Sequence, residues 1–147
     1  MSSLFSHLGA LGRAVALRPE ARDFAARAWL GAPVVELSLA VAGLRRTLGW
    51  IEAFPVSAEP RHEAVSVKEG ERLVRGAYKA HIFGGRCLSR SLVQYLLHRR
   101  DGTSARFVVG VRRPESTLDA HAWVEGASDP PANPEFQSIL VAGPGGA

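Results

Sequence analysis

The hydrophobic periodicity of the chain changes once, near Gly102, and this change limits the folds available to it. Before Gly102, apolar residues recur every three or four positions, as on one face of a helix. After it they alternate with polar or small residues, as in a half-buried strand. Helices followed by a run of short strands indicate an α+β fold. We therefore expect N-terminal helices followed by a cysteine-bearing helix that packs on a short antiparallel sheet.

The chain has the length and composition of one globular domain. Its 147 residues are 46% hydrophobic and 22% charged, which excludes an intrinsically disordered protein. We expect a single domain over 1–147, with a helical half at 1–54, a Pro-containing linker at 55–65, the Cys/His core at 66–142 and a disordered tail at 143–147.

The helical half reads as two helices. Pro19 predicts the start of a helix that ends at Gly31, and Pro33 predicts a second helix that reaches Leu48. The most apolar stretch, 28–44, is short for a bilayer span of about 20 residues and is interrupted by Gly31 and Pro33. We interpret it as a buried helix and expect no membrane span.

Cys87 lies where one helical pattern has ended and another begins. Ser66 and Glu69 form a capping-box signature, which predicts a helix that ends near the glycine pair 84–85. Directly after the glycines a new helical pattern starts with Cys87 and continues until Gly102. The sequence therefore places Cys87 at a helix N-terminus.

Two strands are expected after Gly102, at 105–112 and at 118–125, and they are expected to pair in antiparallel. In the second strand His121 shares one face with Trp123, while the other face carries small apolar residues suited to packing against a helix. A third apolar run follows at 136–142.

A cysteine at a helix N-terminus is a candidate nucleophile. The reactive species is the thiolate, and a free thiol with a pKa of about 8.5 is mostly protonated near neutral pH. The helix dipole and a neighbouring imidazolium both favour the negative charge. The alternative interpretation of Cys87 is a core residue, because free cysteine is among the most buried residue types.

Among the five histidines, His121 is the candidate base because its strand face is polar beside a helix N-terminus. The alternative is a hydrogen-bonded strand residue. His98 lies in the last turn of the cysteine helix, where a cation suits the dipole, and we expect it to be structural or solvated. His7 and His62 lie in segments that offer them no partner.

Several other functions are not expected. The single cysteine and the dispersed histidines give no zinc-ligand spacing, and the glycine pair does not complete a phosphate-binding loop, so we expect no metal and no cofactor. The net charge is +4, but the arginines are scattered along the sequence and do not form a basic cluster, so we do not expect nucleic-acid binding. One cysteine and an N-terminus without a continuous apolar segment favour a cytoplasmic location.

Three motifs, in this order, resemble those of the lasso-peptide maturation peptidases: CLSRSL at 87–92, FVVGVR at 107–112 and AHAWVE at 120–125. These enzymes belong to the transglutaminase-like superfamily of cysteine proteases. The resemblance implies a transglutaminase-like, papain-like core. The length of the chain is similar to that of the stand-alone peptidase of a split system, in which leader recognition belongs to a separate small protein.

The resemblance also implies an activity and partners. The activity is removal of the N-terminal leader from a ribosomally made precursor peptide through a thioester acyl-enzyme, before an ATP-dependent cyclase closes the macrolactam ring. Residue by residue, it makes Cys87 the nucleophile and His121 the general base. The backbone amide of Cys87 is a candidate oxyanion donor. The implied partners are the precursor peptide, the leader-recognition protein and the cyclase.

The third catalytic residue departs from the family pattern, which places an orienting aspartate about a dozen positions after the histidine. A hairpin turning near Asp129 would bring Asn133 or Glu135 opposite His121 and leave Asp129 in the turn. Asparagine can orient an imidazole, as Cys-His-Asn peptidases show. We therefore favour Asn133, with Asp129 as the alternative.

Two rival functions stay open at this point. One is another acyl-transfer or deamidating enzyme of the same fold, because each such reaction begins with a thioester at Cys87. The other is a catalytically silent adaptor that binds a peptide.

Overall fold

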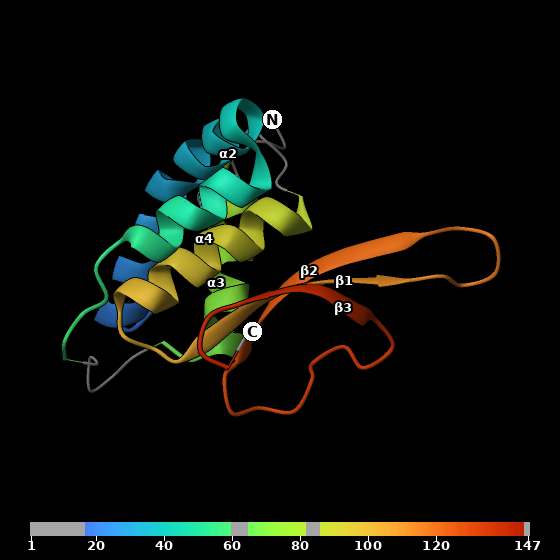
Figure 1. The fold of residues 1–147 in the computed structure, drawn as a ribbon. Coiled ribbons are helices and arrows are strands. Elements are labelled where there is room, and N and C mark those ends of the chain that lie inside the picture. The colour runs from blue at the N-terminus through green and yellow to red at the C-terminus, as the bar shows by residue number, and fades with distance from the viewer. Residues whose placement is uncertain (1–16, 60–64, 82–85, 146–147) are drawn as a thin grey trace, which may run out of the picture.

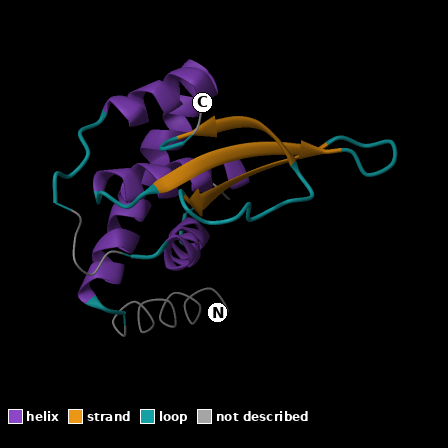
Figure 2. Cartoon of the chain, turned by 60° about the horizontal axis from the view of Figure 1, so that its bottom comes forward, coloured by secondary structure: helices purple, strands orange, loops and turns teal. Residues whose placement is uncertain are grey.

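The computed structural model describes residues 17–59, 65–81 and 86–145. Helices form one part of the molecule and a three-stranded sheet lies against them (Figures 1 and 2). The elements are α2 (Pro19–Ala53), α3 (Val67–Lys79), α4 (Cys87–Arg100), β1 (Ala105–Arg112), β2 (Asp119–Gly126) and β3 (Gln137–Ala142). The order of helices followed by antiparallel strands confirms the α+β fold class.

The break in the first helical segment is at Gly43, and the predicted break between Gly31 and Pro33 is wrong. Gly43 has φ 77° and ψ 174°, a conformation that glycine adopts without a Cβ clash. Pro33 lies inside α2, between the buried residues Ala32 and Val35, whose packing holds the helix together across it.

Our interpretation of this segment as a buried helix is also wrong for one face of α2. Apolar side chains that stay largely exposed run along that face: Leu30, Val34, Leu37 and Val41. By length and composition α2 passes the test for a helix that could cross a membrane, a test that core helices of soluble proteins also pass.

The start of α3 confirms the capping-box prediction, because the Ser66 hydroxyl accepts a hydrogen bond from the Glu69 amide at 3.1 Å. The helix ends at Lys79, earlier than the predicted end near the glycine pair. Two residues after the end of the helix, the ring of His81 stacks on Trp29 of α2, with the ring centroids 4.8 Å apart. The glycine pair itself lies outside the described residues.

The sheet has the order β2-β1-β3, with both pairings antiparallel. The first two strands confirm the prediction, but β3 does not pair with the histidine strand. It pairs with β1, so residues 127–136 form a loop that crosses from one edge of the sheet to the other. The continuous apolar run of β1 around Phe107, Val108 and Val109 suits a central strand better than an edge.

Because β2 is an edge strand, its free edge is available to the start of α4. The Ser91 hydroxyl, one turn after Cys87, donates a hydrogen bond to the carbonyl of Ala122 at 2.9 Å, which joins the N-terminal half of α4 to β2. The core between α4 and the sheet includes Leu92, Phe107 and Val124. This packing sets the position of Cys87 relative to His121.

Candidate active site

Cys87 is the first residue of α4, as predicted. The N-cap residue Arg86 is extended and makes no side-chain cap. The first backbone hydrogen bond of the helix runs from the Arg90 amide to the Arg86 carbonyl, at 3.1 Å. Within the described part of the chain, the amides of Cys87, Leu88 and Ser89 therefore have no acceptor, and they form the positive end of the helix dipole beside a half-buried thiol.

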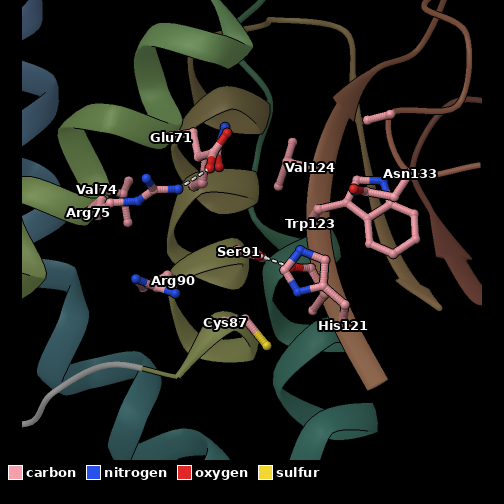
Figure 3. A pocket seen from close by; sticks show the side chains of 13 residues that line it. Glu71, Val74, Arg75, Cys87, Arg90, Ser91, His121, Trp123, Val124 and Asn133 are labelled. Carbon is pink, nitrogen blue, oxygen red and sulfur yellow. Dashed lines mark hydrogen bonds and ion pairs between the residues drawn. The ribbon is translucent and has the colours of Figure 1, made fainter. Parts of the chain in front are cut away.

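A cavity of about 290 Å³ opens at this helix end (Figure 3). Figure 3 shows the side chains of Cys87, from α4, and His121, from β2, projecting into the same space between the two elements. The cavity lining contains Cys87, His121 and Asn133 together, along with residues of α3, α4, β2 and the 127–136 loop: Glu71, Val74, Arg75, Arg90, Ser91, Gln94, Ala122, Trp123, Val124 and Ala132.

No direct hydrogen bond between Cys87 and His121 occurs among the described contacts. In catalytic sites without substrate such bonds are often long and tighten only in the substrate complex. The shared cavity is therefore the geometric basis for treating the two residues as a pair.

The imidazole of His121 is held by two aromatic rings. It stacks on Trp123 with centroids 5.7 Å apart and an interplanar angle of 22°, and Phe136 lies 5.6 Å away. Gly110 is the residue opposite His121 in the sheet. A Cβ at Gly110 would come within 2.7 Å of Trp123 and 2.9 Å of Phe136, so the missing side chain makes room for both rings.

The two candidates for the third catalytic residue lie in different places. Asn133 lines the cavity, although it comes from the crossing loop and not from a strand paired with β2. The hairpin register expected for it is therefore wrong. Asp129 is exposed, its carboxylate lies against Gly126, and it is not part of the cavity lining. Glu135, exposed as well, lines a different hollow beside Arg112.

Two cationic side chains approach the site. Arg90, three residues after Cys87 on α4, lines the cavity, and Arg75 lines it from α3 while paired with Glu71. Behind the helix start, burial raises the pKa of Tyr78 to about 12. The phenol therefore stays protonated near neutral pH and does not compete with His121 as a base.

His98 is a structural residue of the core and not a cation at the helix end. Its side chain is fully buried against the ring of Phe24, at 5.1 Å between centroids. Burial lowers the pKa of His98 to about 4, so the ring is neutral near neutral pH. The dipole argument does not apply to His98 because Leu97 and His98 lie on the buried face of the last turn of α4, while Arg100 is exposed.

The arrangement suits acyl transfer by a thiol. The cavity combines a candidate nucleophile, Cys87, and a candidate base, His121, at the N-terminus of a helix. Across residues 17–59, 65–81 and 86–145 no three side chains of His, Cys, Asp or Glu gather as a metal site. His7 and His62, which we expected to lack partners, lie outside these residues.

Sequence reasoning missed Gly110, Phe136 and Ser91. The first two come together only through the β3–β1 pairing, and Ser91 acts through a carbonyl of another element. Only the spacing of Ser91, four residues after Cys87 on the same helix face, could have signalled its place at the site.

The chain matches a protein-family model described as the transglutaminase-like superfamily over residues 31–140, a range that contains every residue of the cavity lining. No curated protein and no solved structure matches the chain.

Proposed function

The chain belongs to the transglutaminase-like superfamily, whose members are commonly cysteine proteases or acyltransferases. We propose that it is a cysteine peptidase, and that it removes the N-terminal leader from a ribosomally made precursor of a lasso peptide. The observation that carries the proposal is the cavity shared by Cys87, at the open N-terminus of α4, and His121, on the edge strand β2. The motifs at 87–92, 107–112 and 120–125 support the choice of substrate.

In the first half of the reaction, His121 takes the proton of the Cys87 thiol and the thiolate attacks the carbonyl carbon of the scissile bond. The oxyanion that forms accepts hydrogen bonds from the open amides at the start of α4. The C–N bond then breaks, His121 returns its proton to the leaving amine, and the leader stays on Cys87 as a thioester.

In the second half, His121 removes a proton from a water molecule, which attacks the thioester carbonyl. The C–S bond breaks, the leader leaves with a free carboxylate, and the proton returns to the thiol. We assign Asn133 the task of orienting the imidazole, as its place in the cavity lining supports. These steps require no metal and no cofactor.

The proposal includes partners and a cellular location. A cavity of about 290 Å³ accommodates the residues around one peptide bond but not a long leader, which supports capture of the leader by a separate small protein. We propose that the peptidase acts in the cytoplasm, upstream of the ATP-dependent cyclase. Cleavage well below substrate saturation should then be much slower without the leader-binding protein, and equal rates would contradict this part of the proposal.

The test of the activity is cleavage of the matched precursor, followed by mass spectrometry, in the presence of the leader-binding protein. Cys87→Ala and His121→Ala should each lower turnover by about 10⁴-fold or more, because nucleophile and base act as one unit. His81→Ala is the matched control, because that histidine stacks on Trp29 outside the cavity lining. Near wild-type turnover of either site variant, with an unchanged circular-dichroism spectrum, would refute the assignment.

The same measurement separates peptidase from acyltransferase. Water as acceptor gives a leader with a free carboxylate, whereas an added amine that captures the thioester gives a product of different mass. An adaptor without catalysis gives neither product.

A further inference from the structure

Glu125 is a buried carboxylate on β2 that the reaction steps above do not use. Its relative exposure is 7%, and it lies two residues after Trp123 on the same strand face. A buried carboxylate is costly unless donors surround it. Three donors do so here: Arg106 Nη2 at 2.8 Å from Oε1, and Trp123 Nε1 and the Ala132 amide, each at 3.0 Å from Oε2.

The two donors to Oε2 both lead to His121. Trp123 is the ring on which the imidazole stacks, and Ala132 directly precedes Asn133 in the cavity lining. The loop of 127–136 has no helix or strand of its own. The other described bonds of this loop are backbone bonds from the amides of Ala127, Asp129 and Phe136, the last to the Asn133 carbonyl, and a bond from Arg106 Nη2 to the Asp129 carbonyl. Among the described bonds, the one from the Ala132 amide to Glu125 joins the middle of the loop to β2.

We propose that Glu125 is a positioning residue, whose Oε2 holds the indole of Trp123 and the Asn133 segment against His121 while its Oε1 is bound by Arg106. The proposal rests on the proposed function, because the pair that Glu125 serves is Cys87 and His121. The two oxygens have separate tasks. Loss of the Arg106 ion pair should therefore affect stability, whereas loss of the Oε2 contacts should affect the reactivity of Cys87.

Glu125→Gln is the informative change. A glutamine of the same size has one oxygen and one NH₂ group where Glu125 has two acceptor oxygens. If its oxygen faces Trp123 and Ala132, its NH₂ faces the guanidinium of Arg106; if its oxygen faces Arg106, its NH₂ faces the two Oε2 donors. Donors therefore meet donors in either orientation, and the side chain must move away from the position that holds Trp123 and the Asn133 segment. Arg106→Gln is the matched control: it removes the ion pair and the 3.3 Å bond from Arg106 Nη2 to the Asp129 carbonyl, and it leaves the Oε2 contacts in place.

The readout is the rate of Cys87 alkylation by iodoacetamide as a function of pH, which needs no substrate. Glu125→Gln should slow alkylation near neutral pH by about tenfold. Arg106→Gln should leave the rate near the wild-type value. In the His121→Ala background, adding Glu125→Gln should change nothing, because Glu125 acts only through the imidazole.

An equal slowing in the presence and absence of His121 would overturn the proposal and make Glu125 a structural residue. So would equal rates for Glu125→Gln and Arg106→Gln. If Glu125→Gln does not fold, Trp123→Phe removes the Nε1 donor and keeps a ring, and an unchanged rate in that variant would overturn the proposal too. A wild-type rate that does not depend on His121 overturns the proposed function itself, which is a separate result.

Discussion

The two ends of α4 differ in how their backbone groups are satisfied. At the C-terminal end, Gly102 has φ 74° and the chain closes in a Schellman motif. All four last carbonyls accept hydrogen bonds there: Leu97 from Asp101, His98 from Thr103, Arg99 from Gly102 and Arg100 from Ser57. At the N-terminal end, the first three amides have no acceptor among the described residues. The carbonyls at one end of the helix are all paired, whereas the first three amides at the other have no acceptor in the described part of the chain.

The two histidines near these ends show the same difference. His98 is enclosed by Phe24 and Gly70 at the closed end, and the neighbouring Asp101 makes two 2.9 Å hydrogen bonds with Arg27. His121 at the open end is half buried and lines a cavity. The same residue type is thus a core group in one place and a candidate base in the other.

The largest effect in this comparison is expected at the open end, in the third catalytic position. Asn133→Ala should lower turnover by up to about four orders of magnitude, because the orienting group fixes the imidazole. Asp129→Ala should leave turnover near wild type, since that side chain is exposed and outside the cavity lining. Cleavage of the matched precursor measures both.

The reverse result, a damaging Asp129→Ala and a silent Asn133→Ala, would mean that the loop changes its path when substrate binds. If both variants stay active, the site works as a Cys-His dyad.

At the closed end, Asp101→Ala should lower the free energy of unfolding by about 3 kcal/mol, because it leaves the partly buried Arg27 without its main partner. Asp23→Ala is the control. Asp23 also pairs with Arg27, but it is half exposed, so its loss should cost less than about 1 kcal/mol. Urea denaturation measures both, and equal costs would show that the closed end does not stabilise the fold as described.

Acid should also act at the closed end. His98 has a pKa of about 4 in the folded protein against 6.5 for the free side chain, with burial as the main cause, Asp101 opposing it and Arg27 adding to it. Between these values the unfolded chain binds the proton and the folded chain does not. The contribution of neutral His98 to the free energy of unfolding is therefore fully present above pH 6.5 and is lost as the pH falls toward 4.

The loss from His98 amounts to at most about 3 kcal/mol. Urea denaturation of wild type and His98→Gln across this range measures it. The slope of stability against pH should be smaller in the variant. Identical slopes would place the acid sensitivity elsewhere.

The smallest effect is expected for the stability of the nucleophile variant. Cys87→Ala removes a half-buried thiol at the open end, so the free energy of unfolding should change by less than about 1 kcal/mol. Thermal melts followed by circular dichroism check this. A much larger loss would mean that Cys87 is a core residue, which was the alternative interpretation of the sequence.

Features encoded locally were predictable from the sequence. The Ser66 cap, the position of Cys87 at the start of α4 and the alternation of β1 and β2 each depend on neighbouring residues. The approach of His121 to Cys87 followed from the resemblance and from the polarity of its strand face.

Features set by distant contacts were not predictable. The pairing of β3 with β1 depends on which strand can be buried on both faces, and periodicity within β3 does not record this. From the sequence, Pro33 was a stronger indication of a helix break than Gly43. The structure has the break at Gly43, because packing around Pro33 keeps the helix continuous there. The burial of His98 likewise depends on α2 and α3, which a dipole argument confined to α4 ignores.

The central claim is that Cys87 and His121 act as a nucleophile and base pair at the open end of α4. The most direct test is alkylation of Cys87 by iodoacetamide across neutral pH, in the wild type and in His121→Ala. The account predicts that wild-type Cys87 reacts much faster near neutral pH than Cys87 of the variant, because the variant lacks the imidazole that takes the thiol proton. Two profiles that superimpose would contradict it.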